Sequence, residues 1–110
     1  MHLDRLLPWF HLKSVPGIGN LLMKRLIDCF QRPEAVLEAD SRTLSRTAGI
    51  PQRLAERIER HRLPGAVAAE LENIQQSGIE VVTYNDARYP RLLREIADPP
   101  PFLYVYGQLD

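Results

Sequence analysis

The sequence predicts an α+β protein in which helices come first and a strand–helix–strand segment comes last. Two observations support this fold class. Between residues 3 and 62, apolar residues recur at helical spacing in short segments separated by Pro and Gly. After Gly78, two apolar runs rich in β-branched and aromatic residues, IEVVTY and FLYVYG, flank the amphipathic stretch PRLLREIA. With 110 residues, of which 45% are hydrophobic, the chain can bury one modest core or two very small ones.

Prolines and the apolar pattern place the first three predicted helices. Residues 3–13 form a short helix whose regular part starts at Pro8, because proline lacks an N–H and clashes with the turn before it. The second helix ends near Phe30, and its apolar face combines Leu21, Leu22, Leu26, Ile27 and Phe30. Pro33, at a first helical position, opens the third helix in the stretch EAVLEA.

Capping residues bound the next two predicted helices. Asp40 or Ser41 can cap SRTLSRTA by accepting a free backbone N–H, and Gly49 closes that helix. Pro51 then begins the amphipathic stretch PQRLAERIERHR. These signals complete about five short helices before Pro64.

A domain boundary is predicted at Pro64-Gly65, between a helical domain over residues 1–63 and a second part over residues 64–110. The second part opens with a connecting helix that ends near Gly78. About seventeen residues separate the two strands, enough for a right-handed parallel crossover. Because a two-stranded parallel sheet is not viable alone, the segment predicts the start of a larger sheet. Its unpaired strand edges predict self-association into a homo-oligomer.

An internal repeat is visible when residues 12–27 are laid over residues 44–59. The matched pairs are Leu12 and Leu44, Gly17 and Gly49, Ile18 and Ile50, Leu22 and Leu54, and Leu26 and Ile58. Both copies contain a Gly-Ile turn followed by an amphipathic helix, which is typical of two stacked helical hairpins. Pro51 stands where the first copy has Gly19, so we expect a weaker anion site in the second turn, since proline donates no N–H.

The first turn, Val15-Pro16-Gly17-Ile18-Gly19, matches the G-h-G hairpin of a helix-hairpin-helix element, in which the apolar residue h enters the core. Glycines allow close backbone approach, so the N–H groups of the turn and of the next helix can converge on a DNA phosphate. The candidate phosphate-binding residues are Gly17, Gly19, Lys13, Lys24 and Arg25. The alternative is a tight interhelical turn that needs glycine only for sterics.

The charge distribution and the absence of certain motifs limit the classes to which this protein can belong. Net charge is zero, but residues 1–65 hold eleven Lys and Arg against seven Asp and Glu, whereas residues 66–110 hold three against seven. Any preference for anions therefore belongs to the N-terminal part. No apolar run reaches the roughly 20 residues of a membrane helix, which favours a soluble, cytoplasmic protein with no membrane partner. We expect Cys29 to be a small buried hydrophobe, and we expect no metal, no cofactor and no catalytic residues.

Two stretches, LKSVPGIGNLLMKRLIDCFQRPEAVLEA and GIEVVTYNDARYPRLLREIADPPPFLYVYGQLD, resemble the N-terminal part of the DprA/Smf family of DNA-processing proteins. The second stretch is the more specific, because Tyr89-Pro90, Leu92-Leu93, the run from Asp98 to Pro101 and the strand ending at Gly107 occur together and in order. The resemblance covers nearly the whole chain.

The resemblance implies a helical domain of the sterile-alpha-motif or helix-hairpin-helix type, followed by the first β-α-β unit of a Rossmann-like domain. It implies a non-enzymatic role in natural transformation: binding and protecting incoming single-stranded DNA and helping to load a RecA-type recombinase. The family's principal DNA site lies beyond Asp110, so the helical domain is either an auxiliary DNA contact or a protein-interaction module or spacer. A nucleotide-binding enzyme of the Rossmann class is a third, weaker interpretation.

Overall fold

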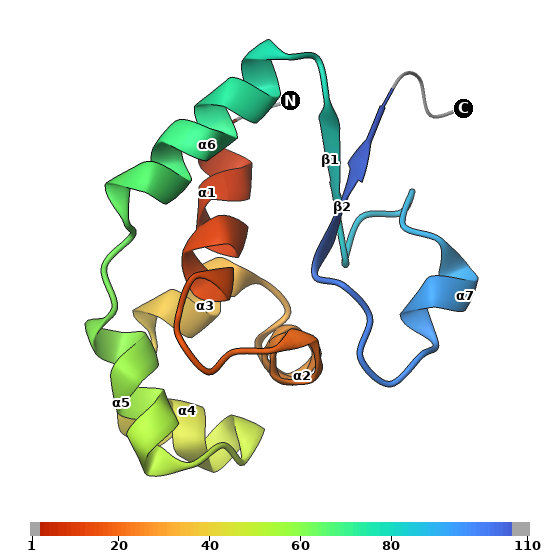
Figure 1. Ribbon diagram of the computed structural model, residues 1–110. Helices are drawn as coiled ribbons and strands as arrows, with labels where there is room; N and C mark the ends of the chain where they lie inside the picture. Colours follow the sequence, from red (N-terminus) through yellow and green to blue (C-terminus); the bar gives the residue numbers. More distant parts are fainter. Residues whose placement is uncertain (1–2, 107–110) are drawn as a thin grey trace.

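The computed structural model describes residues 3–106, with side chains from Asp4 onward. Helices precede a small sheet, as Figure 1 shows. In order, the elements are α1 (Leu3–Lys13), α2 (Asn20–Phe30), α3 (Pro33–Glu38), α4 (Ser41–Ala48), α5 (Gln52–Arg60), α6 (Gly65–Gln76), β1 (Glu80–Thr83), α7 (Arg91–Arg94) and β2 (Phe102–Val105). The predicted α+β class is confirmed.

Two helical hairpins, α1–α2 and α4–α5, form the N-terminal part. Each turn contains a glycine with positive φ, Gly17 at 95° and Gly49 at 69°. The isoleucine that follows each glycine, Ile18 or Ile50, is buried. Glycine reaches positive φ without the steric cost that a Cβ brings, so each turn can direct its isoleucine inward. The predicted repeat is therefore present as two structurally similar turns.

A single apolar cluster joins the helices and the strands. Its fully buried members include Leu12, Leu26, Leu44, Ile58, Leu71 and Val82. Helix α6 packs along α1, and the rings of Phe10 and Phe102 stack with their centroids 4.4 Å apart. Burial of this contiguous apolar surface supplies the main stabilising free energy. The predicted division into residues 1–63 and 64–110 stays a prediction.

The predicted parallel β-α-β crossover is wrong, because β1 and β2 pair antiparallel, with Thr83 opposite Phe102 and Glu80 opposite Val105. A parallel connection must carry the chain back along the full length of the first strand. The only helix in this connection, α7, has four residues and spans roughly 6 Å. The chain therefore re-enters the sheet beside the point where it left, and the Tyr84 N–H donates to the Pro101 carbonyl at 2.8 Å.

Tyr89 and Arg94 hold the loop between the strands in this shape. The Tyr89 hydroxyl donates to the Pro100 carbonyl at 2.8 Å. The Arg94 guanidinium donates to the carbonyls of Tyr84 and Asp86 and lies 5.6 and 5.3 Å from the ring centroids of Tyr84 and Tyr89. These contacts bring the two ends of the loop together, which favours the antiparallel pairing.

Two local expectations are also corrected. Pro8 lies inside α1 and does not begin its regular part, since the helix starts at Leu3. Cys29 is exposed and not a buried hydrophobe, and its Sγ lies 3.7 Å from the Thr47 carbonyl oxygen at the end of α4.

A histidine cluster connects the end of α1 to the segment after α5. His11 Nε2 lies 3.1 Å from the His61 carbonyl oxygen, and Ser14 Oγ lies 2.8 Å from His61 Nε2. The two imidazole centroids are 5.7 Å apart. Burial, followed by the nearby His11, lowers the pKa of His61 below its ordinary value of 6.5. The cluster therefore favours neutral His61 in the folded state.

We expect this cluster to make the chain less stable in mild acid. The pKa of His61 is lower in the folded state than in the unfolded state, so the unfolded chain binds the proton first as the pH falls. The contribution of His61 to the free energy of unfolding is therefore complete above about pH 6.5 and is lost as the pH falls below that value. Urea unfolding between about pH 7.5 and 5.5 measures the free energy of unfolding against pH. The slope of that plot should be smaller for His61→Gln than for the parent chain. An equal slope in the two proteins would contradict this assignment.

Candidate nucleic-acid interface

The first hairpin turn leaves backbone N–H groups without a side-chain cap. Gly19 is the N-cap residue of α2, with φ −92° and ψ −177°, and makes no side-chain capping hydrogen bond. The first intrahelical bond runs from the Met23 N–H to the Gly19 carbonyl at 3.0 Å. The N–H groups before Met23 have no intrahelical partner, and they lie at the positive end of the helix dipole. In α4, by contrast, the Asp40 carboxylate accepts the Thr43 N–H at 2.8 Å.

Glycine occupies positions 17 and 19 of this turn for different reasons. Gly17 has φ 95°, and a Cβ at that position would lie 2.9 Å from Arg57 Nη1 and 3.4 Å from Leu54 Cδ1. Gly19 has negative φ, and a Cβ there would meet no atom within 4 Å. The fold therefore requires glycine at position 17 but gives no internal reason for glycine at position 19.

The second hairpin lies against the first turn. Arg57, on α5, donates from Nη1 to the Pro16 carbonyl at 2.9 Å. A shallow groove of about 440 Å³ lies beside this contact, lined by Gly17, Pro51, Arg53, Leu54 and Arg57. Arg53 and Arg57 are both exposed. The turn is thus accompanied by arginines from the other hairpin.

The basic residues predicted from the first hairpin do not converge at its turn. Lys13 lines a separate groove that includes Phe102 and Tyr104. Lys24 pairs with Asp28 at 2.8 Å, and the hydrogen bond to that carboxylate raises the pKa of Lys24. Arg25 is exposed on α2. Of the five predicted residues, only Gly17 and Gly19 belong to the turn itself.

Sequence reasoning missed Arg53 and Arg57. They are close to the turn in space but far away along the chain, since Arg57 follows Pro16 by 41 residues. The repeat offers a usable signal for one of them, because its alignment pairs Arg57 with Arg25, one of the predicted residues. Arg53 has no such signal, because its repeat partner is the apolar Leu21.

A cleft of about 540 Å³ lies between the helices and β1, and its lining holds three arginines and three carboxylates. On the β1 side, Arg88 forms ion pairs with Glu80 and Asp86. The hydrogen bonds from Arg88 lower the pKa of Asp86. Because one arginine faces two carboxylates, this wall offers no net attraction for an anion such as a phosphate.

Within residues 3–106, no group of three or more His, Cys, Asp or Glu side chains is placed to hold a metal ion. No helix in the same range is long and apolar enough to cross a membrane.

The helical part is similar to a known class of protein domain. Residues 11–59, which contain both hairpin turns, match the family model described as "SAM-like Helix-hairpin-helix tandem". The predicted helix-hairpin-helix assignment is confirmed.

A relative extends this classification beyond the helices. The chain is 36% identical over 102 residues to Protein Smf of Synechocystis sp. (strain ATCC 27184 / PCC 6803 / Kazusa), an alignment that covers 93% of this chain and 26% of that protein. The similarity confirms the predicted resemblance to the DprA/Smf family. The chain spans about a quarter of the length of this curated relative. No solved structure matches the chain.

The different roles of the two glycines lead to a stability prediction. Gly17→Ala should destabilise the chain by about 1–2 kcal/mol or more, because a Cβ is strained at positive φ and meets Arg57. Gly19→Ser should be neutral or stabilise by a few tenths of a kcal/mol, because serine is a better N-cap than glycine and has room. Urea unfolding of both variants measures this. Equal destabilisation by the two changes would contradict the assignment.

Proposed function

We propose that this chain is the N-terminal part of a DprA-like, non-enzymatic protein that handles single-stranded DNA. The second part of the proposal is that its tandem helix-hairpin-helix region makes an auxiliary contact with the DNA backbone. The similarity to Protein Smf supports the first part of the proposal, and the helix-hairpin-helix match supports the second. In this proposal the protein is cytoplasmic, and the parent protects incoming DNA and helps to load a RecA-type recombinase during natural transformation. Its main DNA site then lies outside this chain.

Gly19 is the observation that carries the proposed contact. Glycine is a weaker N-cap than serine, asparagine or aspartate, yet it occupies this position without a conformational or steric requirement. A phosphate oxygen can accept the free N–H groups of the first turn of α2, and the absence of a Cβ lets it approach the backbone. Glycine at this position is therefore explained by an external anion.

The first two helices carry basic side chains, although these do not converge at the turn itself. Among the predicted residues, Arg25 is exposed on α2, and Lys13 and Lys24 add positive charge within the same two helices. The ion pair with Asp28 reduces the positive charge that Lys24 can offer to a phosphate. Contacts of this kind position a nucleic acid without reading its sequence. We therefore expect binding that depends strongly on salt and weakly on base sequence.

Gly19→Ser tests the proposed contact. The serine hydroxyl should cap the same N–H groups and its Cβ should obstruct the phosphate, so we expect roughly three- to tenfold weaker binding to a fluorescent oligo(dT) at low salt, with stability unchanged or higher. Gly65→Ser is the matched control, because Gly65 opens α6 and a Cβ added there would also meet no atom within 4 Å. Fluorescence anisotropy measures the affinity. Equal binding by both variants and the parent chain would reject the contact.

A protein-interaction role is the second candidate for the helical domain. Leu21, in the first turn of α2, is 52% exposed, which leaves an apolar side chain beside the hairpin turn. A recombinase of the RecA type is the partner to test. If Leu21→Ser abolishes capture of the recombinase and leaves oligo(dT) binding unchanged, this second function is favoured. Capture that persists after residues 1–63 are deleted from the parent protein counts against it.

A further inference from the structure

The groove beside the first turn is built by both hairpins. Gly17 contributes from the first hairpin, whereas Pro51, Arg53, Leu54 and Arg57 contribute from the second. Its volume of about 440 Å³ is within the range of small-ligand sites. A ligand in this groove therefore contacts two segments that are distant in sequence.

The groove has a strong positive charge. Its lining holds two guanidinium groups and no carboxylate. Arg53 and Arg57 are four residues apart on α5, so they project from the same face of the helix. A guanidinium has five N–H donors, and the bond from Arg57 Nη1 to Pro16 orients that group while leaving most of its donors free. Planar guanidinium groups match the oxygens of a phosphate well.

The groove also gives access to the backbone. Gly17 has no side chain between its main chain and Arg57. On the opposite wall, the N–H groups in the first turn of α5 have no intrahelical partner, and its N-cap residue, Pro51, makes no side-chain capping bond. An anion placed here meets two guanidinium groups and the positive end of a nine-residue helix.

We propose that this groove binds a phosphodiester group of the nucleic-acid strand, held by the guanidinium groups of Arg53 and Arg57. The inference rests on the proposed DNA contact of the first turn and extends it to the second hairpin. It also gives the second hairpin a role in binding, although Pro51 lacks the N–H that Gly19 keeps. An acidic protein segment is the competing ligand, and the experiment below separates it from DNA.

Arg53→Ala is the direct test, because Arg53 is exposed and makes none of the contacts that hold Arg57 against the turn. In the 110-residue chain, we expect about fivefold weaker binding to fluorescent oligo(dT) at about 50 mM salt. We also expect the slope of log affinity against log salt to decrease by about one. Arg53→Lys should recover part of the affinity by restoring the charge.

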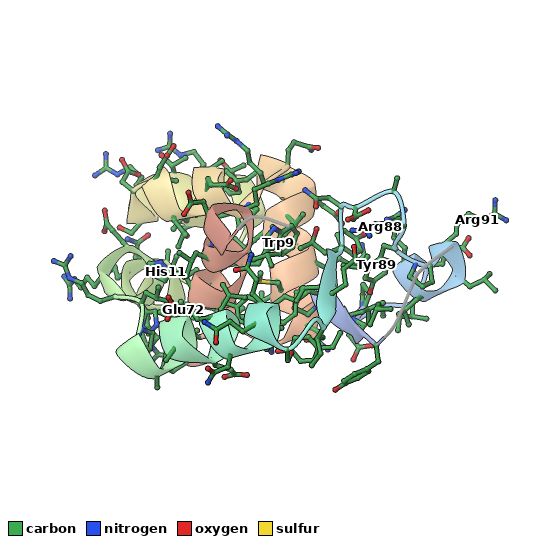
Figure 2. All side chains as sticks on the ribbon, turned by 90° about the horizontal axis from the view of Figure 1, so that it is seen from above. Trp9, His11, Glu72, Arg88, Tyr89 and Arg91 are labelled. Atoms are coloured by element: carbon green, nitrogen blue, oxygen red, sulfur yellow. The ribbon has the colours of Figure 1, made fainter. Side chains whose placement is uncertain are left out.

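Arg91→Ala is the matched control. It removes the same charge, and Figure 2 shows Arg91 on α7, pointing outward on the far side of the strands from the hairpins. If Arg53→Ala and Arg91→Ala weaken oligo(dT) binding equally, or if neither weakens it, the proposed phosphodiester site in the groove is overturned. Circular dichroism of each variant confirms that folding is retained.

The outcomes separate this inference from the proposed function. If Gly19→Ser weakens binding and Arg53→Ala does not, the turn binds DNA and the groove does not. If Arg53→Ala weakens binding and Gly19→Ser does not, the groove is supported and the contact at α2 is rejected. If the chain binds a fluorescent poly-glutamate peptide through Arg53 and ignores oligo(dT), both nucleic-acid assignments fail.

Discussion

The helical tandem depends on the positive φ of Gly17 and Gly49. At each turn this backbone conformation reverses the chain and sends the next residue, Ile18 or Ile50, into the shared core. A residue with a Cβ incurs a steric cost in the same conformation. The positions of α2 and α5 follow from these turns, and so does the contact between Arg57 and the Pro16 carbonyl. One local constraint therefore sets both the core and the exposed surface beside it.

The proposed DNA contact involves Gly19, the glycine of the first turn that this backbone constraint does not explain. Gly17 is accounted for by its φ and by Arg57, whereas Gly19 has neither explanation. The first turn of α2 keeps uncapped N–H groups, and Arg57 of α5 contacts the Pro16 carbonyl of the same hairpin turn. The strand segment is part of the same architecture, because Phe102 stacks on Phe10 of α1 and packs against the apolar core.

Local patterns predicted the helices and the tandem because caps, prolines and apolar spacing act over a few residues. The strand direction was not predictable in this way, because it depends on Tyr89 and Arg94 contacting residues elsewhere in the loop. The candidate site shows the same limit. Lys13 and Lys24 are near the turn in sequence, but their side chains line other surfaces, whereas Arg57 reaches it across 41 residues.

A backbone-amide NMR titration of the chain with unlabelled oligo(dT) tests the central claim most directly. The account predicts that the largest chemical-shift changes fall on the turn, on the first turn of α2 and on Arg53 and Arg57, with α7 unaffected. These changes should diminish as salt is raised. Shifts confined to the groove of Lys13, Phe102 and Tyr104, or no shifts at saturating DNA, would contradict it.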